Sequence, residues 1–243
     1  MSSTEHTCLR WAGMSAVAGA LVQLAQSPAA GAYPHNGSDG AAFLAWGLPG
    51  RRMEILGIGW AVGWGLLLQF MILLGVAYTR RAGRTTAAVK VMTYNMICVT
   101  TVQVIAPALD IAFIHMARHH PGFGTGQAER DLITLLWGAC NILATLSMFQ
   151  LSLVWVAVFA ANHRWPLLPP VLGRWGTAGV AVLCVAAAGS LFVPSGPWAP
   201  GSLFAVALWF GVYAWIIAAG VIFLRRAGLH APRPDSGTRQ SVP

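Results

Sequence analysis

The chain has 243 residues, of which 56% are hydrophobic and only 9% are charged. A soluble domain carries about 25% charged residues, so this composition excludes an ordinary water-soluble core. The formal net charge of +8 is better explained by basic residues that flank membrane spans than by a nucleic-acid partner, and we predict that no nucleic acid is bound.

The apolar residues lie in blocks of about 20, the length that a helix needs to cross roughly 30 Å of hydrocarbon. This pattern predicts an all-α, polytopic transmembrane bundle of six helices, because the alternating strands of a membrane barrel are absent. We expect one transmembrane domain over residues 1–226. Residues 227–243 are polar and contain three prolines, which predicts a disordered cytoplasmic tail.

The first apolar run, residues 11–24, is short and rich in alanine and glycine. It precedes Ala30-Gly31-Ala32, whose small side chains are typical of a signal-peptide cleavage site. Two interpretations stay open: a retained first helix, or a signal peptide removed near residue 32. The Pro- and Gly-rich segment that follows predicts a loop, and residues 41–48 predict a short interfacial helix that carries Trp46.

The second span is expected over residues 55–78. Gly59 and Gly63 within it are four residues apart, a spacing that lets two helices approach closely in lipid. A dinucleotide-binding interpretation of these glycines is poor, since no strand precedes them. The remaining spans are expected over residues 87–116, 131–161, 174–193 and 202–224.

Six spans place both chain termini on one side of the membrane, and the basic residues indicate which side. Eleven of the fifteen Lys and Arg residues fall on the side of the termini and four on the other. The positive-inside rule therefore predicts cytoplasmic termini in the cell's inner (plasma) membrane. The four on the outer side are Arg51, Arg52, Arg118 and Arg130.

Asp110 is the only acidic residue inside an apolar run. It lies about 30 Å along its helix from Lys90 at 1.5 Å per residue, near the outer membrane boundary. Two roles stay open: an ion-pair anchor with Arg51 or Arg52, or a group that handles protons or contacts a ligand. The same face is expected to hold four further acids: Asp39, Glu54, Glu129 and Asp131.

Three histidines follow Asp110. His115 and His119 are four residues apart, so a continuing helix would show both on one face, a spacing that suits a metal ion. Asp110 and His115 are five apart and share a face poorly. We favour a solvated helix end with His115 as a ligand contact, and we assign no metal ion and no cofactor.

Tryptophans concentrate in the outer halves of the predicted helices. They either pack the bundle or wall a pocket under Asp110 that suits a sterol-, terpenoid- or lipid-like molecule. We therefore expect an integral membrane protein that binds a lipid- or isoprenoid-like molecule near Asp110. The other expected ligand contacts are Trp60, Trp64, Trp137, Trp209, Arg51, Arg52 and His115.

Five amides lie inside the predicted spans, and amides in lipid usually bond to one another between helices. We expect the same of Gln69, Asn95, Gln103, Asn141 and Gln150.

The last third of the chain resembles a broad, functionally uncharacterised group of bacterial six-helix membrane proteins that is common in actinobacteria. The resemblance rests on Leu168-Pro-Pro-Val-Leu-Gly-Arg-Trp-Gly176, which opens the fifth span, and on Trp215-Ile-Ile-Ala-Ala-Gly-Val-Ile-Phe-Leu-Arg-Arg226, which closes the sixth. It implies an integral membrane protein of the same architecture. The group has no established activity, so no functional residue is carried over.

In its length and tryptophan content the chain also resembles the small membrane-embedded terpene cyclases, which use acidic residues near the membrane surface to protonate an alkene or epoxide. The resemblance implies an alternative function as a cyclase or isomerase. Asp110 and Glu54 would then supply acid and base, and Trp60, Trp64 and Trp209 would stabilise a cation through their ring faces. Those enzymes are usually described with seven helices, whereas six are expected here.

Overall fold

The computed structural model describes the backbone of residues 3–30, 39–193 and 203–229. Every regular element within these ranges is helical. Six of the helices are long and apolar enough to cross a membrane. An apolar chain in lipid must satisfy its own backbone hydrogen bonds, and each helix does so within one segment.

All seven predicted helices, including the short one before the second span, are present. Apart from the fifth span, the long ones begin or end several residues outside the predicted limits, because an apolar run marks the part of a helix that suits lipid and not the whole helix. The helices are α1 (Ser3–Ala30), α2 (Gly40–Gly47), α3 (Arg52–Ala82), α4 (Ala87–His119), α5 (Gln127–Arg164), α6 (Thr177–Gly189) and α7 (Leu203–Leu229).

The fifth span is not a single regular helix. It opens with a π-helical turn, η1 (Val171–Gly176), and closes with a 3₁₀ turn, η2 (Ser190–Phe192), on either side of α6. The last span, α7, continues through Leu229, slightly past the predicted domain limit at residue 226. The rest of the predicted tail lies outside the described residues.

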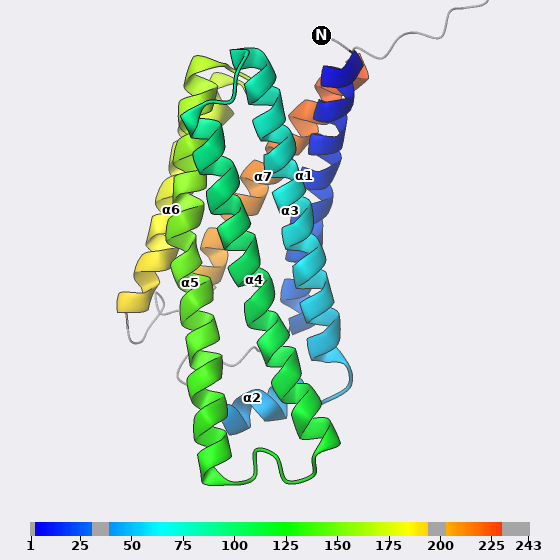
Figure 1. Ribbon diagram of the computed structural model, residues 1–243, viewed down its shortest axis with the longest axis vertical. Helices are drawn as coiled ribbons and strands as arrows, with labels where there is room; N and C mark the ends of the chain where they lie inside the picture. Colours follow the sequence, from blue (N-terminus) through cyan, green and yellow to red (C-terminus); the bar gives the residue numbers. More distant parts are fainter. Residues whose placement is uncertain (1–2, 31–38, 194–202, 230–243) are drawn as a thin grey trace, which may run out of the picture.

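The start of α1 and the end of α7 lie at the same end of the bundle, which we call the terminal end (Figure 1). The two helices run antiparallel in close contact: a Cβ built on Gly13 would lie 2.7 Å from the carbonyl oxygen of Gly220. The ring of His6 bonds the carbonyl oxygen of Ala227 at the same end. On its other side α1 packs against α3, so α1 is an integral part of the bundle.

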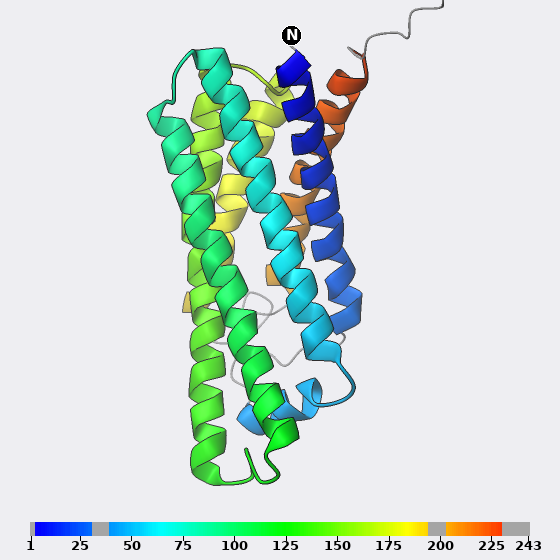
Figure 2. The same cartoon turned by 45° about the vertical axis from the view of Figure 1, so that its right-hand side comes forward.

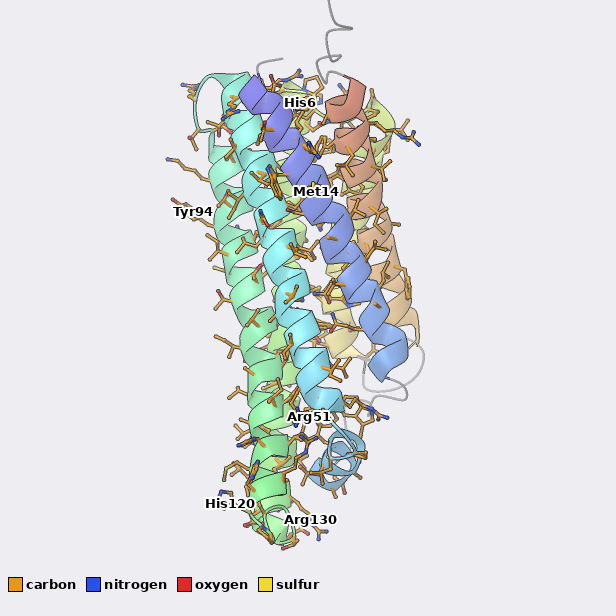
Figure 3. All side chains as sticks on the ribbon, turned by 90° about the vertical axis from the view of Figure 1, so that its right-hand side faces the viewer. His6, Met14, Arg51, Tyr94, His120 and Arg130 are labelled. Carbon is orange, nitrogen blue, oxygen red and sulfur yellow. The ribbon has the colours of Figure 1, made fainter. Side chains whose placement is uncertain are left out.

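The opposite end is formed by the α4–α5 hairpin, which extends beyond the other helices, and we call it the hairpin end (Figures 1 and 2). The short helix α2 packs across this hairpin, against α4 and α5. In Figure 3, His120 and Arg130 mark the tip of the hairpin, Arg51 lies close to α2, and His6 marks the terminal end.

The apolar interior is divided into two clusters. The main core joins α1, α3, α4, α5, α6 and α7, with Trp64, Phe70, Val99 and Trp155 fully buried. A smaller hairpin core lies under α2 and consists of Phe43, Leu44, Met53, Ile114, Ile133 and Trp137.

The predicted close contact at Gly59 and Gly63 is confirmed, with α1 as the partner. A Cβ on Gly63 would lie 2.5 Å from the amide nitrogen of Gln23, and one on Gly59 would lie 3.4 Å from the side-chain carbonyl carbon of Gln26. These glycines therefore make room for two glutamine side chains, which lets polar groups enter the helix interface.

Candidate functional site

Three of the acids near the hairpin end have local partners. Asp39 accepts a 2.8 Å hydrogen bond from the backbone N–H of Ala42 and thereby caps the start of α2. Glu129 accepts from the N–H of Gly124 at 2.7 Å, just before α5. Asp131 accepts from the side chain of Gln127 at 2.8 Å. Helix starts attract such carboxylates because their first N–H groups have no partner within the helix.

Glu54, the fourth acid, forms an ion pair with Arg118 of α4. The same guanidinium also donates hydrogen bonds to the carbonyl oxygens of Leu48, at 3.2 Å, and of Gly50. Arg118 therefore ties the α2–α3 turn to α4. This arrangement gives Glu54 a structural partner, since its carboxylate holds the arginine in place.

Asp110 differs from the other four acids. The residue is only 8% exposed, and its buried oxygen Oδ1 has no hydrogen-bond partner among the described residues. Glu54 also has one buried oxygen without a partner, but its other oxygen is paired with Arg118. Cys140 of α5 is also buried. The pairing with Arg51 or Arg52 that the sequence left open is not formed. A buried acceptor without a donor costs about 1–3 kcal/mol of stability. Asp110 is an acid for which no bond within the described bundle offsets this cost.

Asp110 lies in a polar layer between the two apolar cores. A chain of hydrogen bonds crosses four helices here. On α1, Gln26 donates to Gln23 at 3.1 Å, and Gln23 donates to the carbonyl oxygen of Trp60 on α3 at 3.2 Å. The Trp60 indole then donates to Gln103 of α4 at 3.3 Å, and Gln103 donates to Ser147 of α5 at 3.0 Å. We call the following set the polar interlayer: Gln23, Gln26, Trp60, Gln103, Asp110, Cys140 and Ser147.

Pro107 lies in α4 between Gln103 and Asp110. These two residues are two helical turns apart on one face of α4, about 10 Å along the axis. Proline has no N–H, so the regular helical bond to the carbonyl oxygen of Gln103 is not made. The interlayer therefore holds a second acceptor without its usual donor, in the same stretch of α4 as Asp110.

Of the five predicted amides, Gln103 forms bonds between helices, but its partners are not the other amides. Gln103 connects α4 to α3 and α5, whereas Asn95 and Asn141 bond to carbonyl oxygens one turn back on their own helices. The expectation of mutual bonding is therefore wrong for these two, because a helix surface always offers a nearby carbonyl acceptor.

The four tryptophans expected around one pocket are in different settings. Trp64 and Trp209 meet edge to face, with ring centroids 6.0 Å apart. They line a cavity of about 10 Å³ in the main core, together with Trp155 and Tyr213. That volume has room for about one water molecule. Asp110 is not among its lining residues.

The other two tryptophans lie closer to Asp110 along the bundle. Trp60 belongs to the interlayer through its bond to Gln103. Trp137 is buried in the hairpin core and stacks on Phe43 of α2, with ring centroids 5.3 Å apart. It is one turn from Cys140 on α5, so the interlayer and the hairpin core adjoin there.

The remaining expected contacts lie at the surface. Arg52 donates to the carbonyl oxygen of Trp46 at 3.4 Å and its guanidinium lies 5.7 Å from that ring. Arg51 is exposed at the N-cap of α3. His115 is exposed on a continuing helix, with its ring centroid 4.3 Å from that of His119. Within the described residues, no three His, Cys, Asp or Glu side chains are grouped so that they could hold a metal ion.

Two functional candidates were missed from the sequence. Gln23 and Gln26 of α1 stand three residues apart and are 3% and 8% exposed. The sequence did indicate them, because two amides on one face of a membrane span are costly in lipid unless both are hydrogen-bonded. They were not chosen as candidates because residues 11–24 could be either a first span or a signal peptide.

Comparison with known protein families, with curated proteins and with solved structures finds no match to this chain. The function must therefore be inferred from the chain itself. The polar interlayer and its unpartnered acid, Asp110, are the features from which we infer it.

Proposed function

We propose that this chain is an integral membrane binding protein that holds a lipid- or isoprenoid-like molecule with its polar head at Asp110. The observation that carries the proposal is the buried carboxyl with an unpartnered oxygen inside a membrane helix. Ionisable groups inside membrane bundles are expensive and usually serve a function. A ligand with a hydrogen-bond donor in its head would supply the missing partner.

The surroundings of Asp110 support a ligand with an apolar body. Above and below the interlayer lie the hairpin core and the main core, which are lined by large apolar and aromatic side chains. Sites for small molecules are typically apolar with a few polar groups that orient the ligand. Asp110 and the amide of Gln103 would have that orienting role here.

We further propose the orientation given by the basic residues, with both termini in the cytoplasm and the hairpin end outside the inner (plasma) membrane. In this orientation Arg130, at the tip of the hairpin (Figure 3), and Arg118, in the last turn of α4, are on the outer side. The ligand head would then be at the outer leaflet level.

The alternative of a membrane-embedded cyclase requires Asp110 and Glu54 to act on one substrate. Glu54 is paired with Arg118, which stands eight residues after Asp110 in α4, about 12 Å along the helix axis. A general acid or base must reach the reacting atom within hydrogen-bond distance. This separation favours the binding function over acid–base catalysis by the pair.

The test is lipid extraction and mass spectrometry of the purified protein. We expect the wild type to carry a hydrophobic molecule that Asp110→Asn loses, because an amide has neither the charge nor the acceptor capacity of a carboxylate. The matched control is Asp131→Asn, an exposed acid at the same end of the bundle, which should retain the molecule. An identical lipid content in the wild type and Asp110→Asn would overturn the proposal.

A further inference from the structure

Three of the four arginines nearest to the hairpin end are already occupied by other partners, and the fourth, Arg51, is exposed at the N-cap of α3. Arg118 bonds Glu54 and two carbonyl oxygens. Arg130 donates to the carbonyl oxygens of Gly124, at 3.1 Å, and Thr125, at 2.8 Å. Arg52 bonds the Trp46 carbonyl and lies over its ring. An arginine held by several acceptors is not available to a second carboxylate without losing those bonds.

The hairpin core also separates Asp110 from these arginines. Ile114, one turn further along α4 and completely buried, lies between Asp110 and Arg118 on the same helix face. Met53 and Trp137 complete the apolar layer there. Because the effective dielectric constant is low in such surroundings, a charge on Asp110 is poorly screened and a direct counter-charge is worth more than at the surface.

The donors within the interlayer are likewise used. The indole of Trp60 donates to Gln103, and the amide of Gln103 donates to Ser147 and to the carbonyl oxygen of Ala144, at 3.1 Å. Cys140, which also belongs to the interlayer, has a thiol, and a thiol is only a weak donor. Among the described residues, the site therefore offers acceptors but no free strong donor and no positive charge.

These observations point to the head group of the ligand. We propose that it is a primary or secondary ammonium, so that the molecule is an amine on a lipid- or isoprenoid-like body. An ammonium brings a positive charge and two or three N–H donors, whereas an alcohol brings one donor and no charge. At least one of these donors would serve the unpartnered oxygen of Asp110. This inference rests on the proposed binding function.

A matched pair of probes tests the head group. Geranylgeranylamine and geranylgeraniol share one apolar body and differ only in the head. We would measure their binding to the wild-type protein in nanodiscs of neutral phosphatidylcholine by native mass spectrometry, because anionic lipids would themselves recruit the amine. We expect the amine to bind at least about tenfold more tightly than the alcohol, in line with a charge-assisted hydrogen bond.

Two variants assign this preference to Asp110. Asp110→Asn should remove the preference for the amine, and Asp131→Asn should keep it. Equal binding of amine and alcohol by the wild type, or an undiminished preference in Asp110→Asn, would overturn the inference. If Asp110→Asn does not fold, an N-trimethyl analogue of the amine tests the inference with the wild-type protein alone. This analogue keeps the positive charge but has no N–H donors, so it should bind at least about tenfold more weakly than the amine.

The extraction experiment separates the two proposals. A co-purified neutral lipid that Asp110→Asn loses would support the binding function and contradict the ammonium head. A bound amine that depends on Asp110 would support both. If neither the co-purified lipid nor the probes depend on Asp110, both proposals fail.

Discussion

At the scale of single residues, Gln103 is the side chain that joins most elements of the interlayer. Its carbonyl accepts from Trp60 of α3, and its amide nitrogen donates to Ser147 and to the carbonyl oxygen of Ala144 on α5. Hydrogen bonds between membrane helices contribute about 0.6 kcal/mol on average and up to about 2 kcal/mol. A residue that makes three of them at a buried position should be among the most sensitive in the bundle.

We therefore expect Gln103→Leu to lower the free energy of unfolding by about 1–2 kcal/mol, because the half-buried indole N–H of Trp60 would lose its acceptor. The measurement is unfolding of the purified protein by SDS titration, followed by circular dichroism. The matched control is Asn95→Leu on the same helix, where the amide bonds only to the carbonyl oxygen of Val91. Equal effects of the two substitutions would show that the interlayer bonds do not stabilise the bundle.

At the scale of elements, the antiparallel contact of α1 with α7 depends on two glycines. A Cβ on Gly13 would lie 2.7 Å from the backbone oxygen of Gly220 and 2.8 Å from the side chain of Leu224. A backbone oxygen in a packed helix pair cannot turn away as a side chain can, so the two helices would have to separate.

Gly13→Ala should consequently lower the free energy of unfolding by about 1–3 kcal/mol. Gly65 of α3 provides the comparison, since a Cβ there meets nothing within 4 Å. Gly65→Ala should be neutral or stabilise the protein by up to about 1 kcal/mol, because alanine is the better helix former. Thermal unfolding in detergent measures both variants, and an equally stable Gly13→Ala would refute the close contact.

The packing of α1 also distinguishes between the two interpretations of the first apolar run, a retained helix and a cleaved signal peptide. Removal of α1 would uncover α3 and α7 and would take Gln23 and Gln26 out of the interlayer. We therefore expect α1 to be retained. The intact mass of the protein purified from membranes with a C-terminal tag checks this, and a mass that corresponds to cleavage near residue 32 would contradict it.

At the scale of the whole molecule, the proposed position of Asp110 near the outer face depends on how the bundle is oriented in the membrane. Ala128 is exposed at the hairpin end, and Thr85 is exposed in the α3–α4 turn at the terminal end. In a variant with the four native cysteines replaced by alanine, Ala128→Cys should react with a membrane-impermeant maleimide on intact cells. Thr85→Cys should react only after permeabilisation, and the reverse pattern would invert the proposed topology.

The architecture was largely predictable from the sequence. A membrane span must be a helix of about 20 apolar residues with its backbone bonds made internally, so the number and order of helices followed from the apolar runs. The short helix α2 and the glycine contact at Gly59 and Gly63 were predicted for similarly local reasons. Spacing also indicated correctly that Asp110 and His115 point to different faces of α4, since five residues correspond to about 140° around a helix.

The partners of the polar groups were decided by tertiary structure alone. Periodicity tells which residues of one helix share a face, but it does not tell which face of another helix they meet, or at what height. For that reason Glu54 could not be assigned to Arg118, nor Trp137 to a core apart from Trp64 and Trp209. The same limit hid the chain of bonds from Gln26 to Ser147. It is this packing, which gives every other acid near the hairpin end a partner and leaves Asp110 without one, that distinguishes Asp110 as the candidate ligand contact.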